Sequence, residues 1–252
     1  MANSLAEPRP LATPRPGAVA TRAAEPARMD LYVSIHKALR SFMGDTLVRV
    51  GRIDVTDAAD RDGALAQLEQ LLDVCLDHLR HENGLVHTAI EARQPAGSQR
   101  IADEHTEHVE TIAELRAEAE LLRDTSGTEA DRLALRLYRH LALFVAENFQ
   151  HMHVEETAQN ALLWQHFSDR ELAELHGRIL AAISPEQHVV VARWMVPAST
   201  PAERARIVGG AKAQMPPEAL LGVMSVVRPH IDDAGWAKLA AAVGIGPGLG
   251  RA

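Results

Sequence analysis

The chain has 252 residues, is 46% hydrophobic but only 4% aromatic, and carries a formal net charge of −8 with its histidines neutral. This acidic balance argues against nucleic-acid binding through phosphate contacts, and no apolar run approaches the length of about eighteen residues that would indicate a membrane span. A single cysteine, Cys75, excludes an internal disulfide framework and fits a reducing cytoplasm, so we expect a cytoplasmic protein that binds neither nucleic acid nor membrane.

The N-terminal half is predicted to form long helices behind an unstructured leader. Residues 1–27 contain five prolines and no apolar period, which predicts a disordered leader. From residue 28 onward, abundant Ala and Leu at helical spacing predict four long helices over about 29–51, 58–93, 99–123 and 129–167. Because short breaks separate them, the sequence predicts an all-α, up-down-up-down four-helix bundle over residues 28–167.

The C-terminal third is predicted to contain shorter helices with clear start signals. Ser168, Ser184 and Thr200 each open a capping box, and in two of the three a proline occupies the first helical position. We therefore expect a helical appendage over residues 168–244 and a flexible tail over 245–252. No ligand-type residues gather in the appendage, so we expect it to offer at most a surface for a protein partner or a second copy of the chain.

Histidine is the unusual component, because eight of the thirteen histidines lie between residues 78 and 153. A helix turns about 100° per residue, so residues three or four apart share a face. The second, third and fourth predicted helices each contain two such residues, either a histidine and a glutamate or two histidines, on one face. The first predicted helix adds one histidine. In chain order the candidates are His36, His78 with Glu82, His105 with His108, and His151 with Glu155.

These candidates fall at one level of the predicted bundle. They occupy the start, end, start and end of successive helices, and antiparallel helices bring those ends together. So many ligands exceed the four that one tetrahedral zinc takes and suit two first-row metals bridged by carboxylates. Imidazole-rich ligation favours iron over calcium or magnesium. A ferritin-like site is the weaker alternative, since the second and fourth helices have no Glu-x-x-His pair.

Ideal helix geometry also sorts the neighbouring residues. His153 points about 160° away from His151 and is expected either to be exposed to solvent or to make a polar contact between helices. His87 lies opposite His78, which predicts the same two alternatives for it. Tyr32, one turn before His36, is expected to be a core residue, with hydrogen bonding to a bound dioxygen as the alternative.

The chain resembles the hemerythrin-like family, also called the HHE cation-binding domain. The resemblance is carried by "IHKALR", "HLRHEN", "DEHTEH" and "FQHMHVEET", and it spans about residues 29–166. It looks most like the bacterial branch with a helical C-terminal extension. The family implies a four-helix bundle that holds a non-heme di-iron centre and binds O2 or related small ligands.

Residue by residue, the resemblance implies that His36, His78, Glu82, His105 and His151 are ligands of two iron ions, which an oxo or hydroxo group can bridge. The second bridging carboxylate is Glu155 or Glu156, and ideal geometry favours Glu155, about 40° from His151 against about 140° for Glu156. The chain departs from oxygen carriers at Val109, where those proteins have a second histidine. His108 lies one residue earlier and is kept as a candidate ligand.

Three functions follow as hypotheses. The leading one is a di-iron protein that binds or processes O2, peroxide or NO. The second is a di-iron oxygenase or peroxidase-like enzyme in which the C-terminal helices cover a substrate pocket. The third is a regulatory module in which the state of iron or O2 changes how the appendage packs.

Overall fold

The computed structural model describes residues 28–246, so the predicted leader and all but two residues of the predicted tail lie outside the described residues. The described chain is helical throughout and contains no strand, which confirms the predicted all-α class. The elements are α1 Val33–Gly51, α2 Ala58–His81, η1 Glu82–His87, α3 Thr88–Glu91, α4 Gln99–Arg123, α5 Thr128–Val154, η2 Glu155–Gln159, α6 Asn160–His166, α7 Asp169–Ala182, α8 Pro185–Ala198, α9 Pro201–Gln214, α10 Pro217–Val227, η3 Arg228–His230 and α11 Asp233–Val243.

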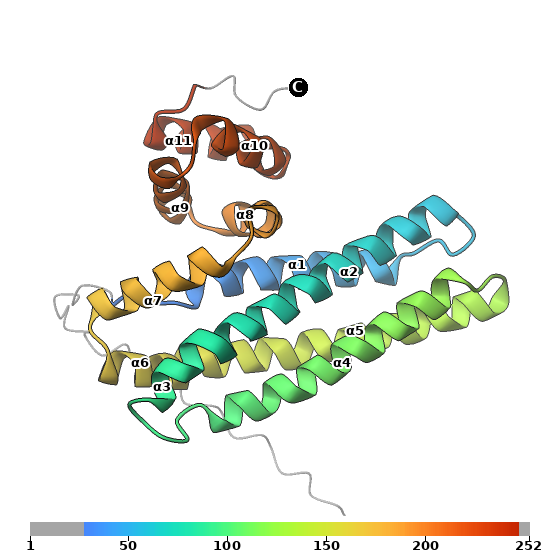
Figure 1. The fold of residues 1–252 in the computed structure, drawn as a ribbon. Coiled ribbons are helices and arrows are strands. Elements are labelled where there is room, and N and C mark those ends of the chain that lie inside the picture. Colours follow the sequence, from blue (N-terminus) through green and yellow to red (C-terminus); the bar gives the residue numbers. More distant parts are fainter. Residues whose placement is uncertain (1–27, 247–252) are drawn as a thin grey trace, which may run out of the picture.

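Four long helical segments pack side by side: α1, α2 with its continuation through η1 and α3, α4, and α5 with its continuation through η2 and α6 (Figure 1). Of these, α1 contacts α2 and α5, and α4 contacts the same two helices. The second and fourth segments each contain one π turn, η1 and η2, inside an otherwise α-helical run. Each π turn begins at a buried glutamate, Glu82 or Glu155.

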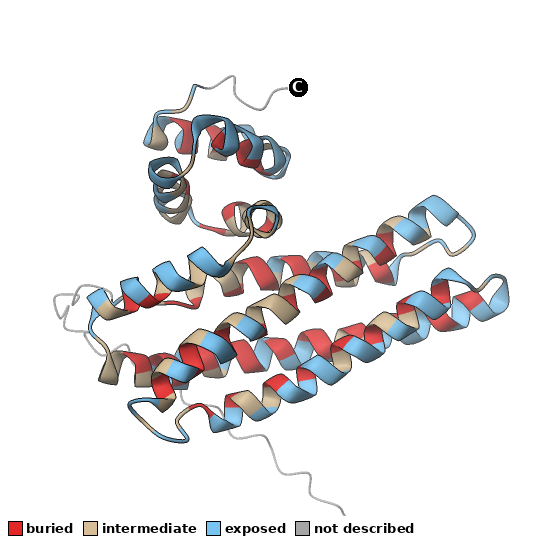
Figure 2. Cartoon of the chain, viewed as in Figure 1, coloured by how far each residue is buried: buried red, intermediate tan, exposed pale blue. Residues whose placement is uncertain are grey.

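Buried residues line the inward faces of these long segments, and exposed residues cover their outward faces (Figure 2). The main apolar core combines aliphatic side chains from all four segments with a few large ones, among them Phe42, Met43 and Phe144. None of the described helices is long and apolar enough to cross a membrane.

The appendage packs on the long helices through its first two members. Arg28, just before α1, donates to Asp169 at 2.6 Å, and its other nitrogens bond backbone carbonyls at the end of α6, which holds the start of α7 there. Helix α8 lies along α1, where the Trp194 indole stacks on the Phe42 ring with centroids 4.1 Å apart. Lys37 of α1 reaches Glu203 of α9 at 2.7 Å.

The last helices enclose an apolar core of their own. One face of α8 joins α9, α10 and α11 around Val196, Met224, Val227 and Trp236. In Figure 1 this group stands apart from the long segments and meets them at α8. Helix α8 therefore serves both cores, with Trp194 facing the main core and Val196 facing the second.

The three predicted capping boxes are confirmed, at Ser168, Ser184 and Thr200. At Ser184 the hydroxyl accepts the Gln187 backbone N–H, and the Gln187 side chain accepts the Ser184 N–H at 2.9 Å. We expect Ser184→Ala to lower the free energy of unfolding by about 1 kcal/mol, since one N–H at the start of α8 loses its acceptor. Urea denaturation measures this.

Ser225→Ala is the matched control for that variant, because Ser225 is exposed inside α10 and caps no helix end. Its stability should stay within about 0.5 kcal/mol of the parent. An equal loss in both variants would contradict the capping role of Ser184.

Candidate metal centre

Six buried or nearly buried side chains from four helical segments meet in the interior. They form two groups of potential metal ligands, in each of which the ligand atoms lie within 4.8 Å of one another. We call them the first ligand group (His36, His78, Glu82, Glu155) and the second ligand group (Glu82, His105, His151, Glu155), and together the ligand cluster. The cluster could hold a metal ion.

Both glutamates belong to both groups, and each directs its two oxygens to different groups. Glu82 Oε1 lies 3.2 Å from His78 Nε2, while its Oε2 lies 3.6 Å from His105 Nε2. Glu155 Oε2 lies 3.3 Å from His36 Nε2, while its Oε1 lies 3.4 Å from His151 Nε2. This is the arrangement of two carboxylates that bridge two cations, with two imidazoles completing each side.

The two carboxylates are buried side by side, which makes the cluster electrostatically costly by itself. Burial, and next the charge of Glu155, raise the pKa of Glu82 well above its usual value. Burial also acts to raise the pKa of Glu155, but the imidazoles of His105, His151 and His36 beside its carboxylate outweigh burial and lower that pKa well below the usual value. Two adjacent carboxylates cannot both ionise cheaply without a cation between them.

Hydrogen bonds fix the orientation of three of the four imidazole rings through Nδ1. His36 Nδ1 donates to Glu156 at 3.1 Å, and Arg40 holds both oxygens of that glutamate at 2.6 and 2.9 Å. His151 Nδ1 donates to Glu104 at 2.8 Å.

His105 Nδ1 is oriented in the same way and donates to Asn83 Oδ1 at 2.8 Å. A neutral imidazole that donates through Nδ1 carries its lone pair on Nε2, the atom directed into the cluster. Such partners of a histidine ligand commonly orient the ring and fix its tautomer.

The donor atoms of the cluster lack other partners, which is the test of whether they fit a metal. Both oxygens of Glu82 and of Glu155, and the Nε2 atoms of His36 and His78, are buried without a hydrogen-bond partner in the described part of the chain. The Nε2 atoms of His105 and His151 lie 3.0 Å apart. Two lone pairs at that distance repel, whereas two nitrogens bound to one cation at about 2.1 Å each reach this separation with a bond angle near 90°. The donors therefore fit a metal pair.

Two predicted ligands lie beside the ligand cluster but outside both groups. Glu156 contacts His36 and Arg40, so it orients a ring of the first group from outside. The His108 ring packs edge-on against that of His151, at 4.9 Å, and against Phe144. Burial, and next the charge of His151, lower the pKa of His108 to about 4, so its ring is neutral at pH 7. His153 is exposed, the first of the two alternatives predicted for it.

Of the two alternatives predicted for His87, solvent exposure is wrong, and a contact between helices is what the structure has. His87 is buried, and its ring stacks on that of His105 with centroids 5.0 Å apart. The reason is η1, because a π turn bonds residue i to i+5 and so brings residues five apart to one face, whereas the prediction assumed an ideal α-helix. The spacing of five between Glu82 and His87 is the one signal in the sequence that could have suggested this.

Two more polar residues, four and five positions along the chain from members of the cluster, are fully buried. Burial, and next the charges of Glu155 and Glu82, raise the pKa of the Tyr32 phenol well above its usual value, and its ring lies 5.2 Å from that of His36. Tyr32 is thus a core residue, as predicted, but one beside the ligand cluster. Asn160, which sequence reasoning missed, follows the π turn η2 and has no exposed surface.

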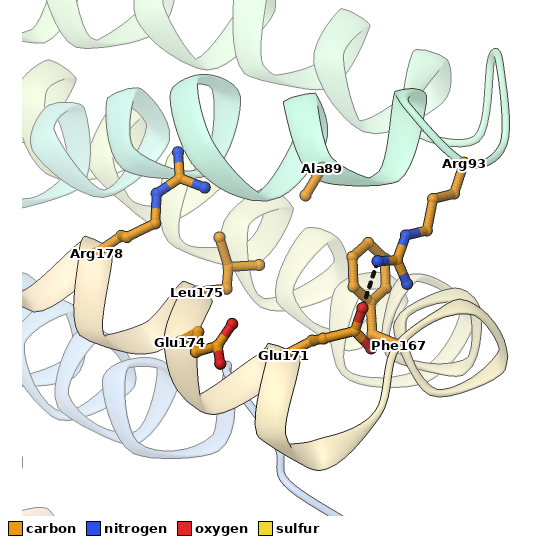
Figure 3. Close-up of a pocket in the computed structure, with 7 residues that line it drawn as sticks. All are labelled: Ala89, Arg93, Phe167, Glu171, Glu174, Leu175 and Arg178. Atoms are coloured by element: carbon orange, nitrogen blue, oxygen red, sulfur yellow. Dashed lines mark hydrogen bonds and ion pairs between the residues drawn. The ribbon is translucent and has the colours of Figure 1, made fainter.

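A surface hollow of about 230 Å³ lies between α3 and α7 and contains none of the ligand cluster (Figure 3). Arg93 spans it, stacks over Phe167 at 3.9 Å and donates to Glu171 at 2.5 Å. The Arg93–Glu171 pair therefore holds α7 to the long helices, and the hollow is distinct from the ligand cluster.

Comparisons with protein-family models, with curated proteins and with solved structures found no match to this chain. The geometry of the ligand cluster therefore carries the functional conclusion.

Removing an orienting carboxylate should weaken metal binding without abolishing it. We expect Glu104→Gln to lower metal affinity about 10- to 100-fold, because the His151 ring loses the partner that fixes its tautomer. Competition with a chelator measures the affinity. Glu107→Gln, at an exposed position on the same helix, should leave it unchanged, and an equal loss there would contradict the role of Glu104.

Proposed function

We propose that the protein is a non-heme di-iron protein of the hemerythrin-like kind, which binds or processes O2, peroxide or NO at the ligand cluster. The observation that carries the proposal is the pair of shared glutamates, each with one oxygen toward either pair of histidines. Glutamate and histidine side chains on the facing helices of a bundle are a known way to hold two iron ions. The mutual contacts of α1, α2, α4 and α5 support an up-down-up-down four-helix bundle around the cluster.

The residues would have separate roles. The four imidazoles and the two carboxylates would hold the metals, and Glu156, Glu104 and Asn83 would keep the rings oriented. The apolar core on one side, with Leu39, Cys75 and Phe144, excludes water. Iron, when bound, would supply the redox chemistry that the side chains lack. The four protein ligands of each group leave coordination positions for a small ligand at five- or six-coordinate iron.

The test is the metal content of the protein produced in iron-supplemented medium. We expect about two irons per chain, one for each ligand group. Air oxidation should produce a near-ultraviolet charge-transfer absorption that dithionite abolishes. Two zinc ions that iron cannot replace, or the absence of any transition metal, would overturn the proposal.

The two other functions predict different measurements. An oxygenase or peroxidase-like enzyme would couple O2 or peroxide consumption to oxidation of an added organic compound. A regulatory module would change the protease sensitivity of the chain after residue 168 when the metal is removed or oxidised. Contacts between α1 and the appendage support the regulatory function. Lys37, the residue after His36, pairs with Glu203 of α9, so a shift of His36 on metal loss would reach the appendage.

A further inference from the structure

One layer of polar side chains borders the ligand cluster at a single end. Tyr32 lies four residues before His36, His87 five after Glu82, and Asn160 five after Glu155. Because α1 starts at this end while η1 and η2 lead toward it, the three positions lie on the same side of the cluster, toward α3 and α6 (Figure 1). We call Tyr32, His87 and Asn160 the polar layer.

Two of its members owe their position to the π turns. In an α-helix, residues five apart point in different directions, but a π turn aligns them, so η1 brings His87 and η2 brings Asn160 to the face of its glutamate. π turns are rare and occur mostly at functional sites. The same device appears twice, each time beginning at a carboxylate shared by both ligand groups.

The polar layer is buried, and four of its polar atoms have no hydrogen-bond partner among residues 28–246. The exposed fractions are 1% for Tyr32, 5% for His87 and 0% for Asn160. The Tyr32 hydroxyl, His87 Nε2 and both amide atoms of Asn160 make no hydrogen bond. Buried polar groups are nearly always paired, so three unpaired ones in a layer beside a metal centre indicate a partner from outside the chain.

The opposite side of the cluster is different in kind. There the main core supplies Leu39, Cys75, Ile112 and Phe144, all buried. His108 lies on this side. Its Nδ1 also has no hydrogen-bond partner among the described residues, but its ring packs against Phe144. The concentration of unpaired groups therefore marks the polar layer as the side that receives a ligand.

We propose that the polar layer binds the exogenous ligand of the metal centre, and that this ligand is hydrogen peroxide rather than O2 or NO. The layer offers both donors and acceptors, since a phenol and a carboxamide can each act as either. Hydrogen peroxide has two O–H donors as well as acceptor oxygens, so it can satisfy both kinds of group. O2 and NO have no hydrogen to donate and would leave the acceptors unpaired. The inference rests on the proposed di-iron function.

The experiment compares three single variants, Tyr32→Phe, His87→Phe and Asn160→Leu, with the parent protein. Each removes the hydrogen-bonding atoms and keeps most of the side-chain volume. Azide affinity of the air-oxidised protein is read from the absorption band of its complex, and stopped-flow titration gives the hydrogen peroxide concentration that displaces half of the azide. Affinity for NO is measured on the reduced protein.

We expect each variant to retain the metal content of the parent and to lose azide affinity by about two- to tenfold, because the azide anion accepts a charge-assisted hydrogen bond from the donors of the polar layer, which neutral NO accepts far more weakly. The half-displacing hydrogen peroxide concentration, corrected for the weaker azide binding, should rise by a similar factor. Affinity for NO should change by less than about twofold. The metal-free Asn160→Leu protein should melt at the same temperature as the metal-free parent or higher, because the lost amide had no partner in the protein.

Two controls separate a ligand-binding role from a structural one. Asn148→Leu makes the same chemical change at a buried amide whose Nδ2 already donates to the Phe144 carbonyl, so it should destabilise the metal-free protein and leave azide affinity unchanged. His108→Phe tests the opposite side of the cluster and should also leave azide affinity unchanged.

Three results would overturn the inference while leaving the di-iron proposal intact. One is unchanged azide and peroxide affinity in all three variants at full metal content. Another is a loss of affinity in His108→Phe alone. The third is loss of a metal ion in a variant, which would make the replaced residue a ligand. A parent protein without transition metal would instead refute the proposed function itself.

Discussion

Glu155→Gln is expected to reduce the metal content from about two ions per chain to less than one. Glu155 supplies one oxygen to each ligand group, and its two oxygens face His36 and His151 at 3.3 and 3.4 Å. Glutamine keeps the shape but replaces one of those oxygens with an NH2 group, which has no lone pair for a metal. Both groups are therefore affected by one substitution. Metal analysis after gel filtration measures the loss.

The matched control is Glu147→Gln, an exposed carboxylate on α5 that touches neither group. It should retain the full metal content. Glu156→Gln should fall between the two, with metal bound more weakly, because Glu156 acts through the His36 ring. Far-ultraviolet circular dichroism must show the same helicity in all three proteins. Full metal content in Glu155→Gln would refute the bridging role.

Metal should also stabilise the folded protein, and Glu155→Gln should lose that gain. A ligand that binds only the folded state at a free concentration of 100 times Kd contributes about 2.7 kcal/mol. The parent protein should therefore unfold at a lower temperature after chelation, whereas Glu155→Gln should be insensitive to the chelator. Differential scanning calorimetry with and without chelator distinguishes the two.

Trp194→Ala is expected to lower the free energy of unfolding by about 3–5 kcal/mol, the usual cost of removing a large buried aromatic side chain. Trp194 is 7% exposed, stacks on Phe42 at 4.1 Å with an interplanar angle of 14°, and lies under the Arg193 guanidinium. It is the aromatic contact that joins α8 to α1. Urea denaturation measures the loss, and limited proteolysis should show faster cleavage near Ser184 and Ser199.

Trp194→Phe is the conservative comparison, since it keeps an aromatic ring against Phe42. The indole Nε1 has no hydrogen-bond partner within residues 28–246. Phenylalanine therefore loses volume but no bond, and its cost should be well below that of alanine. Leu143→Ala, at a side chain that is 63% exposed, should change stability by less than about 0.5 kcal/mol. Equal effects of the three substitutions would contradict the packing role of Trp194.

The order of the helices could be predicted from the sequence because its signals are local. Helical spacing of Leu and Ile, the break at Gln94–Gly97 and the capping boxes each depend on neighbours within about one turn. Helix α4 begins and ends where the spacing predicts, at Gln99 and Arg123. The predicted helices over 58–93 and 129–167 are continuous helical segments, but each contains a π turn that the sequence pattern does not reveal.

The residues of the ligand cluster could also be proposed from the sequence, because His-x-x-x-Glu places two ligands on one helix face. What the sequence could not give is the role of their neighbours. Glu155 and Glu156 are adjacent in the chain, yet one belongs to both ligand groups and the other holds His36 from outside. Neighbouring helical residues point in different directions, and Arg40 of α1 binds the Glu156 carboxylate where it lies, at 2.6 Å.

The sequence by itself determined which side chains can bind metal and on which helices they lie, because residue type and helical period are local properties. The tertiary structure decided which atoms face one another. It directed the two oxygens of each shared glutamate to different histidines, and its two π turns moved His87 and Asn160 inward. Those choices depend on contacts between segments up to 120 residues apart, such as His36 with Glu156, and no periodicity along one helix encodes them.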